Sequence, residues 1–163
     1  MSTMTRKGIK TLTLLIASIA MTACGKGVYY DQSLAVDEHG WLQTDSLDFE
    51  VEVDDTMQLY DFLVEVRNNV QYPYSNIFLF INTTFPDGSI ARDTLECPLA
   101  DDMGQWYGKR AGRYVDSRYR IRQGSMRFPM LGTYRFSISN GMRDSAVNGV
   151  KDIGLRIEYS NKN

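Results

Sequence analysis

The sequence predicts an all-β protein, a two-sheet antiparallel β-sandwich in which a jelly-roll arrangement is favoured over an immunoglobulin-like one. Two patterns lead to this prediction. Apolar and polar residues alternate over several short segments that turn signals separate, and no segment keeps a helical period for about ten residues. With 163 residues, of which 43% are hydrophobic and 12% aromatic, the chain has the composition of one folded domain.

The N-terminal residues 1–23 have the features of a secretion signal. Arg6, Lys7 and Lys10 form a charged region, and residues 11–23 are apolar or small. This stretch is too short for a transmembrane helix, which needs roughly 20 apolar residues, whereas the core of a signal peptide needs about 7 to 15. We therefore expect residues 1–23 to be removed on export.

A cysteine follows this signal directly. The segment Met21-Thr22-Ala23-Cys24 resembles a bacterial lipobox, in which small residues give the signal peptidase access and the cysteine thiol carries a diacylglyceryl group. The alternative is a signal peptide cut near Ala23 with a chance cysteine behind it. We expect Cys24 to be lipidated and to anchor the protein in a membrane.

The remaining chain divides into a tether and one domain. Residues 24–44 are predicted to be the lipidated N-terminus and a tether, because they are mostly small or polar and only weakly periodic. Within them, residues 28–30 are a candidate edge strand. Residues 45–163 are predicted to be the β-sandwich domain, which is a sufficient length for one core.

Charge and cysteine usage exclude several classes of protein. Loss of residues 1–23 changes the formal charge from −2 to −5, and no Lys/Arg-rich block remains, so nucleic acid is not an expected partner. Cys97 has no intramolecular partner once Cys24 is acylated, which rules out a disulfide framework. We expect Cys97 to be a buried, inert thiol.

The first half of the domain shows three strand patterns. Strict alternation from Leu47 to Val53 predicts a half-buried strand, and residues 60–67 repeat the pattern with Leu63 as an exception on the outer face. Residues 77–85 are a continuous apolar run that ends at Pro86-Asp87-Gly88, a sequence that favours a tight turn. We therefore predict a central strand that leads into a hairpin.

The second half supplies the return strand and the rest of the sandwich. Residues 90–99 are predicted to pair back along the hairpin, and further β-type segments cover 106–107, 114–122, 126–128, 134–139 and 153–159. In residues 114–122, Arg118, Arg120 and Arg122 alternate with Tyr119 and Ile121. This spacing is typical of a solvated or edge-protecting face rather than of a ligand site. The total is about eight strands, the number in a jelly roll.

Residues for common catalytic chemistry are scarce. The only histidine, His39, is predicted to be a loop residue, and a Ser/His/Asp or Cys/His site would have to use it. The sequence has no Gly-rich phosphate loop and no His/Cys metal spacing. The acid pairs Asp54-Asp55 and Asp101-Asp102 leave a calcium site or a glycosidase carboxylate pair as minor alternatives, without the spacing that marks either. We expect no catalytic residues, no cofactor and no metal.

Several segments resemble the gliding-motility lipoprotein GldH family of Bacteroidetes, and they occur in order over nearly the whole chain. Besides the lipobox they are Tyr72-Pro73-Tyr74-Ser75-Asn76-Ile77, Asp93-Thr94-Leu95, Trp106-Tyr107-Gly108, Phe128-Pro129, Gly132-Thr133-Tyr134-Arg135-Phe136, Met142-Arg143 and Asp152-Ile153-Gly154-Leu155-Arg156-Ile157-Glu158. The resemblance implies an envelope lipoprotein associated with gliding and type IX secretion proteins. It implies no enzymatic activity and carries no catalytic residues. Relatives also occur in bacteria that do not glide.

The resemblance also bears on location. Surface-exported lipoproteins of this phylum usually carry an acidic cluster just after the cysteine, whereas Gly25-Lys26-Gly27 follows Cys24 here. We therefore expect a lipid anchor in the outer membrane with the domain facing the periplasm.

Three classes of function follow from these observations. The leading one is a non-catalytic component that contacts other envelope proteins, and Tyr72, Tyr74 and Trp106 are its candidate contact residues, because loop aromatics give a large contact area. Core packing is an equally good interpretation of each of the three residues. The second class is a glycan-binding module that stacks sugars on the same rings, and a hydrolase is the weakest.

Overall fold

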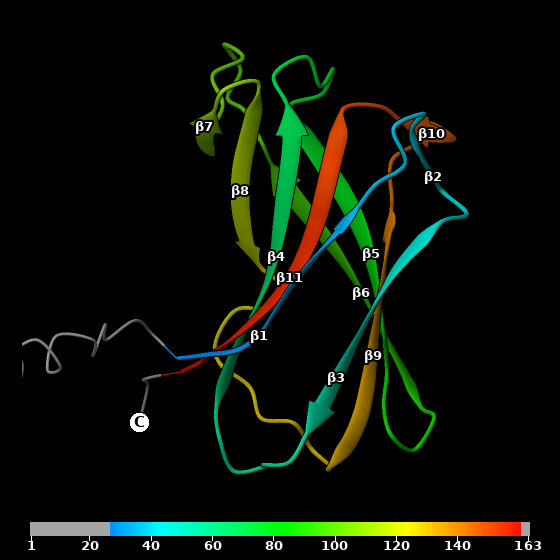
Figure 1. The fold of residues 1–163 in the computed structure, drawn as a ribbon, viewed down its shortest axis with the longest axis vertical. Helices are drawn as coiled ribbons and strands as arrows, with labels where there is room; N and C mark the ends of the chain where they lie inside the picture. Colours follow the sequence, from blue (N-terminus) through cyan, green and yellow to red (C-terminus); the bar gives the residue numbers. More distant parts are fainter. Residues whose placement is uncertain (1–26, 161–163) are drawn as a thin grey trace, which may run out of the picture.

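The computed structural model describes residues 27–160 as a sandwich of two antiparallel sheets with a short two-stranded addition (Figure 1). The strands are β1 (Val28–Ala35), β2 (Trp41–Leu42), β3 (Ser46–Val53), β4 (Tyr60–Asn69), β5 (Asn76–Thr84), β6 (Ile90–Pro98), β7 (Lys109–Ala111), β8 (Tyr114–Arg120), β9 (Gly132–Asn140), β10 (Ala146–Val147) and β11 (Val150–Tyr159). A five-stranded sheet has the order β1-β11-β4-β8-β7 and a four-stranded sheet the order β3-β9-β5-β6. The predicted all-β sandwich is confirmed.

Most connections between the long strands cross from one sheet to the other. The chain changes sheet from β1 to β3, from β3 to β4, from β4 to β5, from β6 to β8, from β8 to β9 and from β9 to β11, while β5 and β6 are neighbours in one sheet. The first long strand, β1, pairs with the last, β11. This strand order is compatible with the predicted jelly roll.

Alternation along the strands builds the interior. In β3, Phe49, Val51 and Val53 are buried, while the acidic residues between them are exposed. Leu63 of β4 lies on the outer face as predicted, in register with Arg120 and Arg156. It is nevertheless only 8% exposed, because long arginine side chains can cover apolar surface with their stems.

The predicted hairpin is confirmed. β5 lies between β9 and β6, and the Ser89 carbonyl accepts a hydrogen bond from the Phe85 amide across the turn. Gly88 has a φ of 83°, a left-handed conformation that costs glycine little. Asp87 accepts hydrogen bonds from the amide and the hydroxyl of Ser89, which fixes the turn.

The predicted tether differs from the structure. β1 pairs with β11, β2 pairs with β10, and Trp41 is only 1% exposed, so residues 28–42 belong to the folded body. An edge strand needs only the backbone groups of its neighbour, so β1 forms without a strong pattern of its own. Residues 1–26, which include the predicted signal peptide and Cys24, lie outside the described residues.

Two short segments that were expected to be strands form isolated bridges. Trp106 pairs only with Ala100, and Met126 pairs only with Tyr60. Loop residues on both sides of each bridge leave no room for a longer ladder. Within residues 27–160 no helix has the length and apolar character needed to cross a membrane.

One end of the interior, which we call the closed end, is filled by buried side chains. It consists of Tyr72, Ile77, Cys97 and Leu99, each at most 4% exposed. Cys97 is free and buried, as predicted, and burial raises the pKa of its thiol to about 12.

Candidate interaction surfaces

The outer face of the five-stranded sheet, which we call the charged face, carries a continuous set of ionic side chains. Because alternate residues of each strand point outward, four adjacent strands contribute to it. Its members are Asp31 of β1, Asp152, Arg156 and Glu158 of β11, Asp61, Glu65 and Arg67 of β4, and Asp116, Arg118 and Arg120 of β8.

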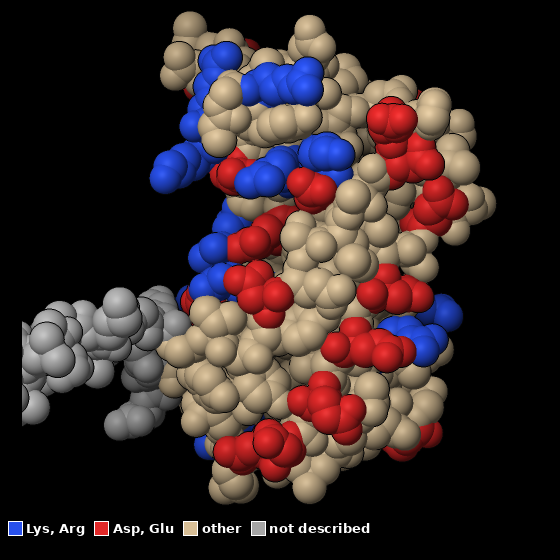
Figure 2. Space-filling view, viewed as in Figure 1, with Lys and Arg blue, Asp and Glu red and all other residues tan. Residues whose placement is uncertain are grey.

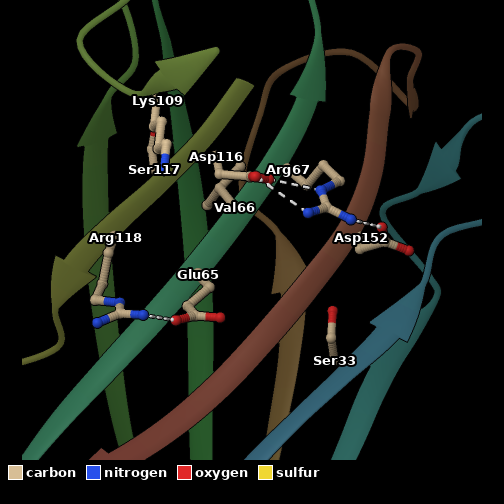
Figure 3. A pocket seen from close by; sticks show the side chains of 9 residues that line it. All are labelled: Ser33, Glu65, Val66, Arg67, Lys109, Asp116, Ser117, Arg118 and Asp152. Atoms are coloured by element: carbon tan, nitrogen blue, oxygen red, sulfur yellow. Dashed lines mark hydrogen bonds and ion pairs between the residues drawn. The ribbon is translucent and has the colours of Figure 1, made fainter. Parts of the chain in front are cut away.

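Arg67 binds acids from both neighbouring strands (Figure 3). Its Nε lies 2.6 Å from Oδ1 of Asp116, its Nη2 donates to Oδ2 of the same residue at 3.1 Å, and its Nη1 lies 3.7 Å from Asp152. The hydrogen bond from Arg67 lowers the pKa of the Asp116 carboxyl. Around this pair the face has a hollow of about 500 Å³, which Ser33, Glu65 and Arg67 help to line.

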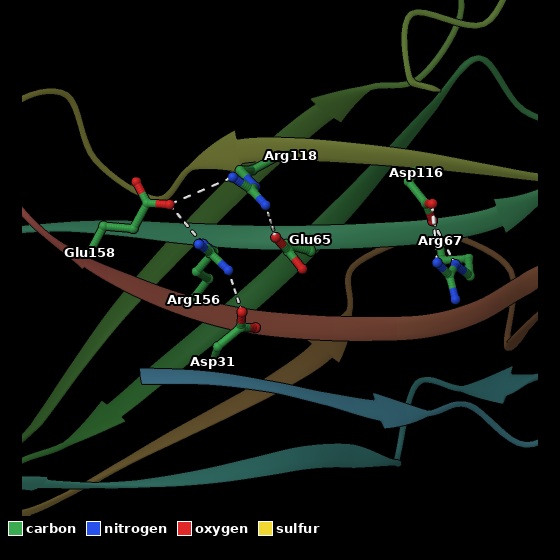
Figure 4. A network of polar contacts seen from close by, with 7 residues as sticks. All are labelled: Asp31, Glu65, Arg67, Asp116, Arg118, Arg156 and Glu158. Atoms are coloured by element: carbon green, nitrogen blue, oxygen red, sulfur yellow. Dashed lines mark hydrogen bonds and ion pairs between the residues drawn. The ribbon is translucent and has the colours of Figure 1, made fainter. Parts of the chain in front are cut away.

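A second chain of contacts runs across all four strands (Figure 4). Arg118 contacts Glu65 and lies 3.6 Å from Glu158, and Nε of Arg156 donates to Glu158 at 2.7 Å. Arg156 also contacts Asp31 on β1. The Glu158 side chain is only 10% exposed and lies between two guanidinium groups. The network therefore joins the strands in their observed register.

Arg120 and Asp61 form a further partly buried pair of this face. Nη1 of Arg120 lies 2.6 Å from Asp61, whose side chain is 10% exposed, and the Ser125 hydroxyl donates to the same carboxylate at 2.7 Å. The expectation of a shared solvated face is confirmed for Arg118 and Arg120. Their partners come from other strands, so the sequence spacing of the arginines alone did not identify them.

The charged face ends in a cationic edge at β7. Lys109, Arg110 and Arg113 are exposed, and the ion pairs of the described chain include none of them. Figure 2 shows Lys and Arg gathered at the upper left, where Figure 1 places β7 and β8, with Asp and Glu predominant elsewhere in that view. Charge is therefore unevenly distributed over the face seen in Figure 2.

The structure places the three aromatic candidates in different environments. Tyr72 is 4% exposed, and its hydroxyl donates to the Asn76 carbonyl at 3.2 Å. Tyr74 is half-buried, packs edge-on against Tyr72 with ring centroids 5.6 Å apart, and donates a hydrogen bond to Asp144. Trp106 is half-buried against the core. Only Tyr74 and Trp106 keep surface for a contact, and their role in binding stays a prediction.

The loop that carries Trp106 returns closely onto β8. A Cβ on Gly108 would lie 2.2 Å from the Ser117 hydroxyl oxygen and 2.5 Å from the Asp116 carbonyl oxygen. Only a glycine permits that approach. The adjacent Tyr107 is 64% exposed. It is an aromatic surface residue that was not among the candidate contact residues predicted from the sequence.

The remaining candidates for chemistry occupy ordinary structural positions. His39 lies on an exposed turn with Nδ1 3.0 Å from Asp37. Asp101 accepts hydrogen bonds from the Met103 and Gln105 amides, so it stabilises its own turn. In the part of the chain that the structure covers, no group of three or more His, Cys, Asp or Glu side chains is placed to hold a metal ion.

Comparison with known proteins gives consistent matches along the chain. A family model described as "GldH lipoprotein" matches residues 28–157. The "Gliding motility lipoprotein GldH homolog" of Christiangramia forsetii is 30% identical over 162 residues, which cover 95% of this chain and 98% of that protein. The "Gliding motility lipoprotein GldH" of Flavobacterium johnsoniae is 29% identical over 152 residues, which cover 89% of this chain and 93% of that protein.

Solved structures give weaker likenesses. An exo-β-1,3-galactanase from Phanerochaete chrysosporium has a TM-score of 0.37 and 11% identity, with 81% of this chain and 27% of that chain covered. The chain therefore spans about a quarter of that enzyme's length. An infectious bursal disease virus structure has a TM-score of 0.20 and 13% identity, over 80% of this chain and 39% of that one. Likenesses at these scores carry no functional argument.

Proposed function

Because the chain belongs to the GldH lipoprotein family, we propose that it is a non-catalytic accessory lipoprotein of a gliding-motility or type IX secretion assembly and acts through protein–protein contacts. The observation that carries the proposal is the family match over residues 28–157, which is almost the whole described body. Two relatives, matched over nearly their full lengths, are named gliding motility lipoproteins.

The chemistry of the described residues supports a non-catalytic role. Burial keeps the Cys97 thiol protonated at neutral pH, and a protonated thiol is a poor nucleophile. The carboxylates of the charged face are held by arginines, and His39 sits on an exposed turn with its ring beside Asp37. These groups are arranged to hold a rigid surface.

The proposed anchor is a diacylglyceryl group on Cys24, in the outer membrane, with the domain facing the periplasm. The lipobox supports it, and stable attachment takes at least two acyl chains because one chain binds membranes marginally. The test is Cys24→Ser followed by membrane fractionation and immunoblotting. We expect release or misprocessing. A variant that is cleaved normally and stays entirely in the membrane fraction would overturn the anchor.

The proposed contact surface is the pair Tyr74 and Trp106 on loops at the end where β4 leads into β5 and β6 into β7 (Figure 1). The experiment is the double change Tyr74→Ala and Trp106→Ala in the full chain, expressed in a deletion strain. We expect loss of envelope crosslinks and of gliding or type IX secretion, with a folded protein present at normal level. The matched control is Met103→Ala, which is 91% exposed in the same loop as Trp106.

Two outcomes would count against this surface. Normal crosslinks and normal gliding or secretion in the double variant would exclude Tyr74 and Trp106 as contacts. Binding of the wild-type protein to a glycan array, lost in the double variant, would replace the protein partner with a glycan. A three-ring sugar platform is already disfavoured, because Tyr72 is buried.

A further inference from the structure

The two sheets leave one side of the sandwich uncovered, between the first half of β6 and the segment that follows β8. β6 is the last strand of the four-stranded sheet. β7 pairs with Tyr114–Asp116 of β8 and stops there, so among residues 27–160 the outer edge of residues 117–120 has no strand partner. We call this region the open side. Near the turn between β5 and β6 the outer edge of β6 is free and a space remains beside it, whereas at the other end of β6 the Tyr119 hydroxyl donates to the Pro98 carbonyl.

The space results from the inward-facing residues of β5 and β6. Along β5 these are Ile77, Leu79 and Ile81, all buried, and then Thr83, which is partly exposed. Along β6, read from the closed end, the inward residues change from Cys97 and Leu95 to Asp93 and Ala91. Side chains that are small or polar cannot fill the interior near the hairpin, and a cleft of about 400 Å³ opens there.

The floor of the cleft is apolar and aromatic. Phe62, Phe128 and Phe136 form its buried part, and Phe85, Ile121 and Met126 are half-buried along its walls. Ring centroids of Phe62 and Phe128 are 5.1 Å apart and those of Phe128 and Tyr134 4.8 Å, so the floor is a packed aromatic cluster. An apolar surface of this kind, open to solvent between two sheets, is the usual form of a binding groove.

Two arginines, Arg122 and Arg127, line the cleft, and a third, Arg92, lies on the opposite face of β6. Nη2 of Arg122 lies 2.6 Å from Oδ1 of Asp93, and this ion pair joins the segment after β8 to β6. Arg127 donates to the Met57 carbonyl at 2.8 Å and, like the exposed Arg92, has no carboxylate partner among the ion pairs of the described body. An inward-pointing charge such as Asp93 normally protects a free strand edge, but Arg122 neutralises it here.

We propose that an extended segment of an envelope partner, with alternating apolar and acidic residues, adds as a β-strand to the outer edge of β6. Its apolar side chains enter the cleft, and its acidic side chains, which alternate with them, lie on the opposite face beside Arg92. This inference rests on the proposed role in protein contacts and names the chemistry of one partner. It does not depend on the surface around Tyr74 and Trp106.

Two features favour a polypeptide over a lipid acyl chain. A free strand edge presents amide and carbonyl groups that another backbone can satisfy and an acyl chain cannot. Successive side chains of a strand point to opposite faces, so one set of side chains of an added strand enters the cleft and the other set faces solvent. The acidic preference follows from Arg92, which is exposed on the outward face of β6 and has no carboxylate partner among the ion pairs of residues 27–160.

The experiment is a selection of ten-residue peptides from a random display library on the full chain in detergent micelles, with counter-selection on the variant Ala91→Arg. Ala91 lines the cleft from β6, and arginine there blocks it. We expect enriched peptides with apolar residues at every second position and Asp or Glu between them. Their affinity should fall at least tenfold in Ala91→Arg.

Thr94→Arg is the matched control, because Thr94 is exposed on the opposite face of the same strand and the change adds the same charge. Affinity should not fall below that of wild type, because Thr94 lies outside the cleft on the same face as Arg92. N-methylation of single amides along the selected peptide should abolish binding only when every second amide is the one changed, because every second amide of an added strand faces β6. This scan leaves the protein unchanged and remains valid if Ala91→Arg is unstable.

Every other outcome overturns the proposal. No peptide enriched over Ala91→Arg, enrichment of cationic peptides, or an N-methyl scan without alternation would each exclude strand addition. Binding of myristate to the wild type, without enriched peptides, would assign the cleft to a lipid. None of these results depends on gliding or secretion, so failure of this inference is distinct from failure of the proposed function.

Discussion

The interior of the sandwich is filled at the closed end and unfilled at the open side, although the same two strands run through both. At the closed end β5 and β6 contribute Ile77 and Cys97, which are fully buried. Near the hairpin the paired inward positions are Thr83 and Ala91, both partly exposed. Backbone pairing continues through both regions, and only the side chains change.

This difference shows that pairing and packing are separate requirements in a β-sandwich. A ladder of hydrogen bonds forms wherever two strands align, but exclusion of water needs side chains of sufficient volume from both sheets. At the open side the five-stranded sheet also contributes less, because β8 ends at Arg120 and only the isolated Met126 bridge continues beside β4. A groove therefore forms where small residues coincide with a strand end.

The largest effect that tests the comparison is expected from Tyr72→Ala at the closed end. The Tyr72 ring is 4% exposed, so its removal should lower the free energy of unfolding by about 3–5 kcal/mol, the usual cost of emptying a buried aromatic site. Chemical denaturation of the purified protein measures this change. Tyr74→Ala is the neighbouring control and should cost about 1 kcal/mol or less, because that ring is half-buried. Equal losses for the two variants would show that Tyr72 and Tyr74 do not differ in burial in solution.

The next effect concerns Cys97→Ser, which places a hydroxyl in the closed end. We expect a loss of about 1–3 kcal/mol, the cost of burying a hydroxyl without a good partner. The raised thiol pKa adds a pH dependence with a definite sign. The unfolded thiol ionises near its ordinary pKa of 9.0 and the folded thiol only near 12, so the stability that the protonated thiol contributes is complete below pH 9 and is lost as pH rises toward 12.

Two measurements check the Cys97 prediction. The stability difference between wild type and Cys97→Ser should shrink between pH 9 and pH 11, and alkylation of native wild type by iodoacetamide at pH 8 should be slow until denaturant is added. Rapid alkylation of the native protein would show that the closed end admits water and would remove the contrast with the open side.

The sequence carries the strands and the hairpin because both depend on local patterns. Alternation identified residues 47–53 and 60–67 as strands, and the turn after residue 85 was correctly placed. The sequence pattern identified only residues 28–30 of β1 as a candidate edge strand and left the rest in the tether, because the order of this strand comes from its pairing with β11. It also could not separate Tyr72 from Tyr74, because the two flank one proline and only the tertiary fold buries one of them.

The sites show the same limit. The spacing of Arg118, Arg120 and Arg122 predicted one shared solvated face, and this prediction is correct for two of them. Arg118 and Arg120 join the charged face, while Arg122 pairs with Asp93 at the open side. Strand alternation ends with β8 at Arg120, and this strand end is set by packing across the sandwich. The cleft itself depends on residues from both sheets, so no single segment of sequence reveals it.

A smaller effect is expected from Arg122→Met, which removes the ion pair across the open side. The side chains are 48% and 25% exposed, so the loss should be about 0.5–1 kcal/mol at low salt. The difference in unfolding free energy between the variant and wild type should become smaller in about 0.5 M salt, because mobile ions screen exposed charges. Denaturant titrations at two salt concentrations measure it. Arg120→Met is the contrasting variant and should cost about 1–3 kcal/mol, since it leaves the Asp61 carboxylate nearly buried and without its arginine.

The smallest effect is expected from Thr83→Val at the open side. The Thr83 side chain is partly exposed in the cleft, so its hydroxyl is solvated and its loss exposes no unpaired group. We expect the free energy of unfolding to change by less than about 0.5 kcal/mol, and valine also favours a strand. The reverse exchange in the filled interior, Val66→Thr, should cost about 1–3 kcal/mol, because Val66 is only 1% exposed. If Thr83→Val proves as costly as Val66→Thr, water does not reach the cleft, and the open side is closed in solution.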